Sequence, residues 1–461
     1  MAIAATVVWE VRTTATAGNV NGGGYKPGAS GTDFSQQNAA QYNLTGVTTA
    51  AADAILLSAS AAADMVGNIA HITSGTNFTV GWYEILSVSV GVSITLDRTC
   101  TTAAGAAGVV NIGGAISLAA ANDDAVFETM VAGNTMHIKS GTYTIGGAVS
   151  VATDGTTAAS VEIIGYNATR NDNPATADRP VLAFGANTST FNGDYYNFSY
   201  ITFTVTNSGG VITGLGSVVR KCKSTNSSGT ANRLAFSLNG GIVLDSEIIS
   251  TLGTGVNINA VSNTTPKIVG CYIHDSTIGI SFDSFDVGVA AFNIIETIVT
   301  TGINIGTGSD DHLIMNNTIY GAATPAGSST GILLAATTGL YSLIMNNIIT
   351  GFVTGISSAA VSTSNVYINN NLFNNTTNYT NVSAGAGSLT LDPAFVDAPN
   401  GNFAVGANMK AVALPGAFPG GLSTGYLDIG AVQRQEPAGG GSIEVSINSV
   451  NITKATGVIG Y

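Results

Sequence analysis

A period of about 24 residues runs through the middle of the chain and restricts its fold more than any other feature. Thr-Gly-Ile-like motifs recur there, and their glycines are separated by 24, 23, 29 and 24 residues. Self-similarity at a fixed period of roughly 20 to 50 residues is typical of solenoids, in which each repeat packs on its neighbours. The five glycines are Gly255, Gly279, Gly302, Gly331 and Gly355.

A second column of small polar residues repeats in step with the glycines, and an aliphatic residue stands two positions after most of its members. This pattern predicts a parallel β-helix, with an inward aliphatic file beside a file of stacked amides. We expect Asn at one bend because it tolerates left-handed backbone, and Gly at the opposite bend, where a positive φ or a close approach excludes a Cβ. The column is Cys222, Ser246, Cys271, Asn293, Asn317, Asn347 and Asn370, and the aliphatic residues are Ile248, Ile273, Ile295, Ile319, Ile349 and Leu372.

The repeat period and the pattern of apolar residues divide the chain into four expected segments. Residues 1–114 lack the period and predict a small N-terminal β domain for docking, whereas residues 115–395 predict the parallel β-helix. We expect residues 396–436 to cap the open end of the solenoid, because an open end is an unpaired sheet edge. In residues 437–461 a PAGGGS linker precedes the alternating SIEVSINSVNIT, which predicts a strand that pairs with a neighbouring molecule.

Composition and charge exclude several classes of function. The net charge is −13, and only 14 Lys and Arg residues are available and are not expected to cluster, which argues against a nucleic-acid partner. No apolar run approaches the roughly 18 residues of a spanning helix, so no membrane insertion is expected. The start MAIAATVVWEVRTT lacks a basic n-region and a long apolar stretch, so we expect synthesis in the cytoplasm without a secretion signal.

The three cysteines, Cys100, Cys222 and Cys271, are too few and too scattered for a disulfide scaffold or a zinc site. Cys222 and Cys271 stand two coils apart in the amide column, roughly 9.6 Å, which is too far for a disulfide. The cysteines thus give no reason to expect a zinc site, and we assign no metal ligand and no cofactor.

Three stretches resemble known families. VAGNTMHIKSGTYTI, Val131 to Ile145, resembles the opening coil of pectate-lyase-like β-helix proteins, which implies a right-handed helix and a short capping helix within Ala115–Met130. Asp123 and Asp124 would favour the N-terminus of that helix. The segment Trp9–Leu44 resembles the start of structural proteins of tailed phages, and the segment LTLDPAF to YLDIGAVQ resembles the terminal cap of bacterial and phage β-helix proteins.

The first candidate site is the stretch that contains Asp310, Asp311 and His312. Asp310 and Asp286 each lie seven residues before a column asparagine, so the two carboxylates are expected at the same place on adjacent coils. A separation of about 5 Å would suit a retaining glycosidase. The Asp-Asp pair resembles that of polygalacturonase-type hydrolases, but their Asn-Thr-Asp, Gly-His and Arg-x-Lys elements are not found in register. A solvated turn or a weak calcium site is therefore the favoured interpretation.

The second candidate is an outward row three residues after the column, formed by His274, Glu296 and Tyr320. These side chains could do acid–base work, but the row continues as Ile249, Thr350 and Phe373, which indicates a mixed surface. Between Lys267 and Lys410 the chain has no Lys or Arg to neutralise a uronate, which argues against a pectate-type lyase. No catalytic residue is assigned, and we expect no enzymatic activity.

The resemblance to phage proteins implies a non-enzymatic virion component, most simply a capsid decoration or cement protein or a head fibre. Its expected partners are other virion proteins of the capsid or tail and further copies of the chain. The alternative is a tailspike or tail-fibre protein that binds or cleaves surface carbohydrate of the host. A bacterial surface adhesin is a third hypothesis.

Overall fold

The structure is a computed structural model, and it consists of two compact units. Unit 1 is Met1–Ile242 with Ser246–Asn257, and unit 2 is Val243–Asp245 with Ile258–Tyr461; each is described by itself. The residues that the structure describes are 3, 6–13, 22–118, 125–187, 189–229, 233–259, 265–283, 287–309, 311–321, 327, 329–335, 341–361, 364–410, 412–413 and 428–433.

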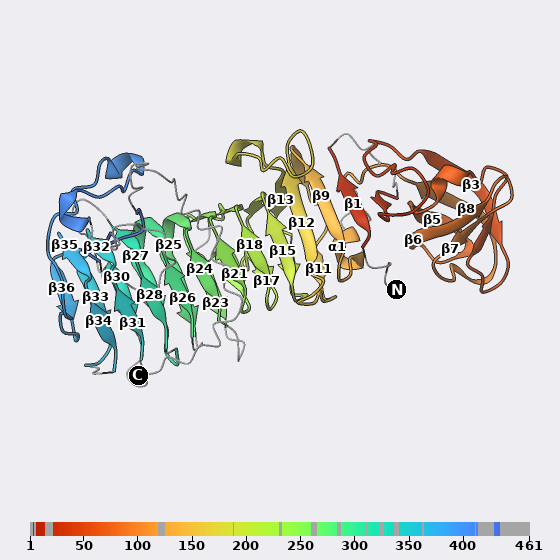
Figure 1. Cartoon of the computed structure of the whole chain (residues 1–461). Coiled ribbons are helices and arrows are strands. Elements are labelled where there is room, and N and C mark those ends of the chain that lie inside the picture. The colour runs from red at the N-terminus through yellow and green to blue at the C-terminus, as the bar shows by residue number, and fades with distance from the viewer. Residues whose placement is uncertain are drawn as a thin grey trace. The chain divides into compact units, whose positions relative to one another are not determined.

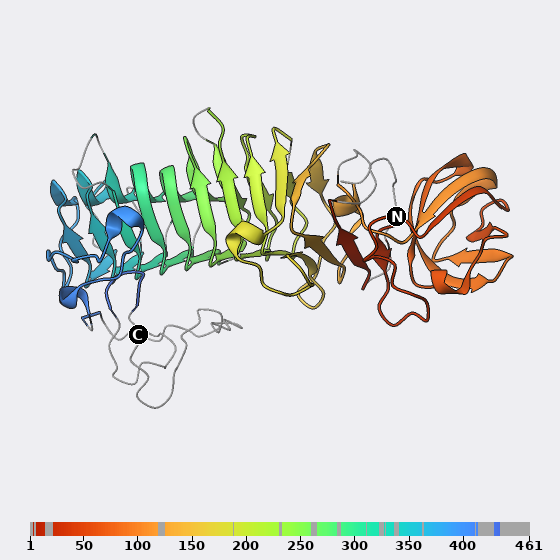
Figure 2. The ribbon, with the colours of Figure 1, turned by 90° about the horizontal axis from the view of Figure 1, so that it is seen from above.

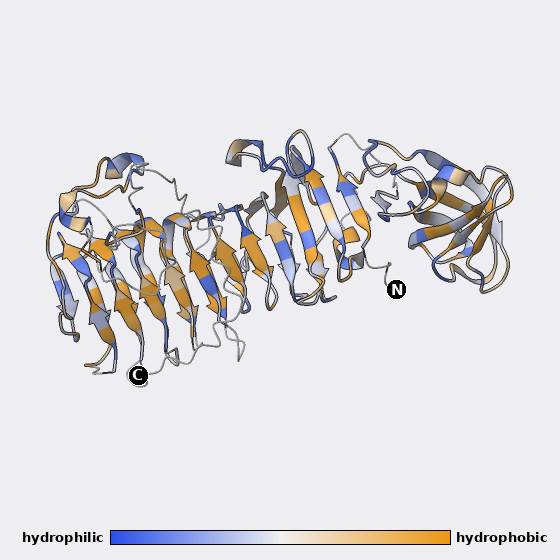
Figure 3. Ribbon diagram, viewed as in Figure 1, coloured by the Kyte–Doolittle hydropathy of each residue, from blue (hydrophilic) through white to orange (hydrophobic). Residues whose placement is uncertain are grey.

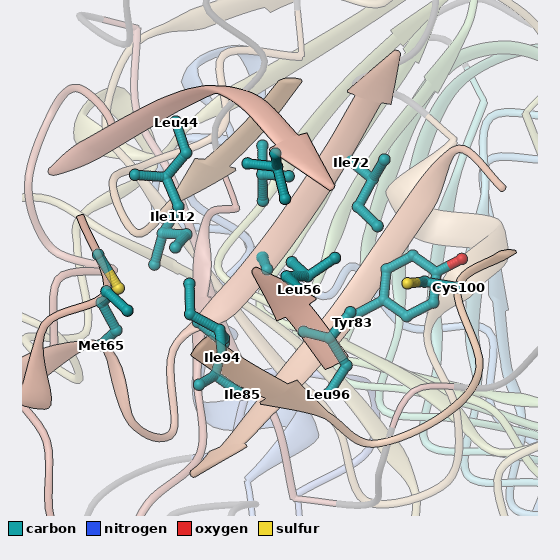
Figure 4. Packing of buried hydrophobic residues seen from close by; sticks show 14 residues of the cluster. Leu44, Leu56, Met65, Ile72, Tyr83, Ile85, Ile94, Leu96, Cys100 and Ile112 are labelled. Atoms are coloured by element: carbon teal, nitrogen blue, oxygen red, sulfur yellow. The ribbon is translucent and has the colours of Figure 1, made fainter. Parts of the chain in front are cut away.

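A closed six-stranded barrel in unit 1 confirms the predicted N-terminal β region, with the strand order β3-β4-β7-β6-β5-β8. Aliphatic side chains alternate with polar ones along its strands and fill the interior, around Leu56, Ile85 and Ile94 (Figure 4). Closure leaves the barrel without a free sheet edge. The strands are β3 (Tyr42–Thr49), β4 (Ile55–Leu57), β5 (Ile69–Phe78), β6 (Gly81–Ser89), β7 (Ser93–Leu96) and β8 (Thr101–Ile112), and a 3-10 turn, η1, spans Ala63–Met65.

Along the sequence, the first strand of the solenoid sheet precedes the strands of the barrel. Strand β1 (Val8–Val11) pairs in parallel with β9 (Thr135–Lys139) and antiparallel with β2 (Gly24–Tyr25). The predicted boundary at residue 114 therefore stays a prediction. The expected capping helix is a single turn, α1 (Val126–Thr129); Asp123 and Asp124 lie outside the described residues.

The structure confirms an all-β chain with a β-solenoid of about nine turns (Figure 1). In unit 1 successive coils pair in parallel, and T-shaped aromatic contacts fill their interior, with ring centroids 4.9 Å apart for Phe191 and Phe198 and 5.6 Å apart for Phe198 and Phe203. The strands are β10 (Thr142–Thr144), β11 (Val149–Val151), β12 (Val161–Tyr166), β13 (Val181–Gly185), β14 (Ser189–Phe191), β15 (Tyr196–Ser199), β16 (Thr202–Val205), β17 (Val211–Thr213), β18 (Val218–Arg220), β19 (Lys223–Asn226), β20 (Leu234–Leu238), β22 (Glu247–Ser250) and β23 (Thr254–Asn259), with η2 at Thr176–Asp178; β21 (Ile242–Leu244) lies at the division between the units.

In unit 2 the predicted aliphatic file is confirmed: Ile273, Ile295, Ile319, Ile349 and Leu372 pair in register on successive strands and are fully buried. Strands β28 and β31 are coloured as hydrophobic in Figure 3, and Figure 2 shows successive strands side by side. The strands are β24 (Lys267–Val269), β25 (Tyr272–Asp283), β26 (Val289–Ala291), β27 (Ile294–Ile305), β28 (Leu313–Met315), β29 (Thr318–Tyr320), β30 (Thr330–Leu334), β31 (Leu343–Met345), β32 (Ile348–Thr350), β33 (Thr354–Ser358), β34 (Val366–Ile368), β35 (Asn371–Phe373) and β36 (Thr377–Thr380).

The amide file is also confirmed, and it is continuous over four coils of unit 2. The side-chain amide of Asn293 donates to the side-chain oxygen of Asn317 over 2.9 Å, and Asn317 donates to Asn347 and Asn347 to Asn370 over 3.0 Å each. Each accepting oxygen also takes a backbone N–H of the preceding coil, such as that of Cys271 for Asn293. Side chain and backbone thus tie each coil to the next.

Two expectations about backbone conformation need correction. The left-handed residue is not the ladder asparagine but the residue before it, as at Phe292 and Asn316, with φ values of 56° and 50°. The repeat glycines Gly279, Gly302, Gly331 and Gly355 lie within strands rather than at bends, and they have no positive φ. They are required by close approach alone: a Cβ on Gly279 would lie 2.5 Å from the carbonyl oxygen of Gly302.

The C-terminal segment of unit 2 packs on the outer side of strands β29 and β32. Ile348 points away from the aliphatic file, and it is buried because Val405, Met409 and Ile429 cover it. The Gly430 N–H donates to the carbonyl of Asn346 over 3.0 Å and fixes the segment to that coil. The segment contains η3 (Ala398–Asn400) and η4 (Ala407–Met409), and its predicted bounds of 396–436 stay a prediction. No helix among the described residues is long and apolar enough to cross a membrane.

Candidate functional site

The first candidate set is split between the surface and the core. Asp286 and Asp310 lie outside the described residues. Asp311 is exposed on a left-handed turn with φ 55°, which fits the expected solvated turn. His312 is only 1% exposed, accepts the Gly288 N–H at Nδ1 over 2.9 Å and faces the ring of Phe282. The imidazole and the carboxylate next to it therefore do not form one site.

The second candidate set is confirmed as a row. His274 pairs in register with Glu296 on the next strand, and Glu296 pairs with Tyr320 on the strand after it. All three side chains are half-buried on the side of the sheet opposite the aliphatic file. We call His274, Glu296 and Tyr320 the outer row.

Two residues that sequence reasoning missed complete the outer row. The hydroxyl of Tyr272 donates to Glu296 Oε1, and its ring stacks on His274 with centroids 4.3 Å apart. His274 Nδ1 lies 2.8 Å from Asp275 Oδ2. Parity could have found Tyr272, because it stands two residues before His274 in one strand. Asp275 breaks that alternation because its φ is 51°.

The outer row joins a carboxylate, a phenol and an imidazole, which are groups able to move protons or to bind the hydroxyls of a sugar. Its Tyr320 end is closed, however. The rings of Phe403 and Phe395 from the C-terminal segment lie 5.5 Å and 6.2 Å from that of Tyr320. In the part of the chain that the structure describes, no group of three or more His, Cys, Asp or Glu side chains could hold a metal.

A buried carboxylate in unit 1 was also missed by the sequence analysis. Glu10 is fully buried and accepts hydrogen bonds from Arg12 Nε over 2.9 Å, from Arg170 Nε over 2.8 Å and from the Tyr166 hydroxyl. Arg170 also donates to Ser35 over 3.2 Å. Because Ser35 belongs to the connection between β2 and the barrel, this network joins that connection to the first coils. It is a structural clamp.

The expectation that the cations do not cluster is wrong for one corner of unit 1. Arg179 and Lys221 lie 5.9 Å and 5.7 Å from the ring centroid of Tyr200, and Lys223 forms a 2.7 Å ion pair with Glu247. Burial lowers the pKa of Arg179. Lys221 and Lys223 are already neighbours in the sequence, whereas Arg179 comes from another coil and meets them only because the coils stack.

All three cysteines are free and buried, and burial was expected for Cys222 and Cys271. Burial raises the pKa of Cys100 to about 11 and that of Cys222 to about 12. Since the thiolate is the nucleophile, neither thiol is suited to catalysis near neutral pH.

No protein-family model matches the chain, and no curated protein matches it. Solved structures do. Pectate lyase Pel9A has a TM-score of 0.52 at 14% identity, over 67% of this chain and 90% of that chain. A PL6 family polysaccharide lyase from Pseudopedobacter saltans has a TM-score of 0.31 at 9% identity, over 62% of this chain and 95% of that one. The likeness to Pel9A shows the fold alone: this chain has the pectate-lyase-like right-handed β-helix.

Proposed function

We propose that the chain is a non-enzymatic structural protein of a tailed-phage particle, as a capsid decoration or cement protein or a head fibre. The observation that carries this proposal is the coil-to-coil amide ladder of unit 2, which runs from Asn293 to Asn370 beside a fully buried aliphatic file. Such a solenoid is a stiff scaffold. The resemblance of Trp9–Leu44 to phage structural proteins supports the assignment to a virion.

The outer row supports a structural role as well. Glu296 is engaged by the hydroxyl of Tyr272, and the ring of Tyr320 packs against those of Phe395 and Phe403. The side chains with acid–base chemistry thus pack against each other and against the C-terminal segment. The partners in this proposal are other virion proteins and further copies of the chain.

The test is the copy number in purified particles of the phage whose genome encodes this chain. Quantitative mass spectrometry against the major capsid protein should find many copies per particle, and antibody-gold labelling should place them on the head. A few copies confined to the tail tip would contradict the decoration proposal and favour a tailspike. Complete absence from purified particles would contradict both.

A second candidate function is binding of host surface carbohydrate, which the Tyr272–His274 stack favours because stacked rings beside carboxylates suit sugars. Titration with host surface polysaccharide should then show binding that Tyr272→Ala and Glu296→Gln weaken at least about tenfold. Tyr341→Ala, which removes an exposed tyrosine outside the outer row, is the control. Equal binding by all variants would contradict this candidate.

A further inference from the structure

Two cations and one tyrosine of unit 1 are stacked at the same bend of three successive coils. The first residues of β13, β16 and β19 pair in register with one another. The residues two positions before these strands are Arg179, Tyr200 and Lys221, so they follow each other along the stack at the ordinary strand spacing. We call these three residues the cationic file.

The aromatic ring is the middle member of the cationic file. Its centroid lies 5.9 Å from the guanidinium carbon of Arg179 and 5.7 Å from Nζ of Lys221, and both distances are typical of cation–π contacts. Backbone bonds fix the spacing of the coils beside the file. The Thr202 N–H donates to the carbonyl of Pro180 over 2.9 Å, which ties the coil of Arg179 to that of Tyr200.

The two cations of the file lack a counter-ion within the part of the chain that the structure describes. Neither Arg179 nor Lys221 forms an ion pair there, whereas Lys223 has a 2.7 Å pair with Glu247. Arg179 Nε is buried and has no hydrogen-bond partner among the same residues. Burial lowers the pKa of Arg179 although Glu247 attracts its charge. A desolvated cation that is not paired within its own chain is a candidate binding group for an external anion.

The chemistry of this corner favours carboxylates of a peptide over other anions. Guanidinium and ammonium groups only donate hydrogen bonds, and the carboxylate of Glu247 is already engaged by Lys223. The corner therefore offers few acceptors for the hydroxyls that a glycan carries beside its charges. A nucleic acid is disfavoured because the chain as a whole carries a net charge of −13.

The spacing of the file also suits an extended peptide. Two coil spacings, roughly 10 Å, separate the backbone of Arg179 from that of Lys221. Acidic side chains on one face of an extended peptide stand about 7 Å apart, and the long side chains of Lys, Arg and Glu span the difference. The stem of the acidic residues would lie over the ring of Tyr200, which is half-buried.

We propose that the cationic file binds an extended acidic peptide segment of a partner protein, with its carboxylates on Arg179 and Lys221 and its aliphatic stems on Tyr200. The partner is defined by this chemistry alone. The proposal does not depend on the function proposed above.

The test is fluorescence anisotropy of a labelled peptide of alternating Glu and Ser residues, titrated with the complete chain at low ionic strength. The parent chain should bind it, and Arg179→Gln with Lys221→Gln should weaken the affinity at least about tenfold, because charge-assisted hydrogen bonds are lost. Lys221→Gln alone should weaken it less. The matched control is Lys410→Gln, which removes the same charge at an exposed position in unit 2 and should leave the affinity unchanged.

Three further probes distinguish the possible ligands. A peptide of alternating Gln and Ser should not bind. Absence of binding by the acidic peptide would overturn the proposal, as would equal affinity of the parent and the double variant or an equal loss in Lys410→Gln. Tighter binding of polygalacturonate or of inorganic polyphosphate than of the acidic peptide, weakened by the same double variant, would also overturn it, because the file then serves a glycan or a phosphate chain.

Discussion

At the scale of single residues, the amide ladder explains why the period is visible in the sequence. Each ladder asparagine bonds both to the side chain and to the backbone of its neighbours, so few other residue types can take the position. The spacing alone predicted this file. It did not predict the left-handed residue before each asparagine, because Phe292 occupies that position as well as Asn316.

Replacing Asn317 tests the ladder. Asn317→Leu removes the side-chain oxygen that accepts both the N–H and the side-chain amide of Asn293, and we expect it to lower the free energy of unfolding by about 4 kcal/mol. Asn317→Ser is the matched control, because Ser246 accepts the N–H of Cys222 at the equivalent position of another coil. The serine variant should lose about half as much in guanidinium unfolding. Equal losses in the two variants would contradict the prediction that hydrogen bonding at position 317 stabilises the fold.

At the scale of strands, sequence reasoning succeeded where a coil is short and regular. The aliphatic file of unit 2 was predicted residue by residue. The core of the unit 1 coils was not predicted, because its aromatic residues Phe191, Phe198 and Phe203 recur at uneven spacing in the sequence. The outer row was predicted from parity. The packing of Phe403 on Tyr320 at the end of the outer row was not predicted, because the two residues are far apart in the sequence and no local pattern connects them.

The close contact between strands β27 and β30 gives a prediction at this scale. An alanine at Gly302 would place its Cβ 2.4 Å from Ile319 Cγ2 and 2.5 Å from the carbonyl oxygen of Gly331. Because backbone must move to admit it, we expect Gly302→Ala to lower the free energy of unfolding by about 2 kcal/mol. Gly229→Ala, at an open position, should change it by less than about 0.5 kcal/mol. Thermal and guanidinium unfolding measure both; no difference between the two variants would contradict the close approach.

At the scale of the whole molecule, sequence reasoning predicted the fold class but not how the chain is connected through it. Strand β1 joins the solenoid sheet before the barrel forms, and its Trp9 packs edge-on against Trp82 of the barrel with centroids 6.3 Å apart. A domain boundary placed where the 24-residue period begins cannot reveal that β1 belongs to the solenoid sheet. The pairing of β1 with β9 joins residues more than 100 positions apart. The Glu10 clamp belongs to the same region.

The clamp is tested by Glu10→Gln. Removing the negative charge leaves the guanidinium groups of Arg12 and Arg170 without their buried partner, so we expect a loss of about 3 kcal/mol in the free energy of unfolding. The control is Glu247→Gln, which breaks the more exposed pair with Lys223 and should cost at most about 1 kcal/mol. Urea unfolding followed by tryptophan fluorescence measures the loss near Trp9 and Trp82. Equal small losses would show that the clamp does not stabilise unit 1.

The burial of all three thiols has a practical consequence for chemical labelling of the protein. Cys100 and Cys222 are fully buried and Cys271 is 1% exposed, so the native chain offers a maleimide dye almost no target. One cysteine introduced on the surface would then be labelled selectively without first removing any native residue. A fluorophore or a heavy-atom cluster could thus be attached at a chosen coil, and distances from that coil could be measured.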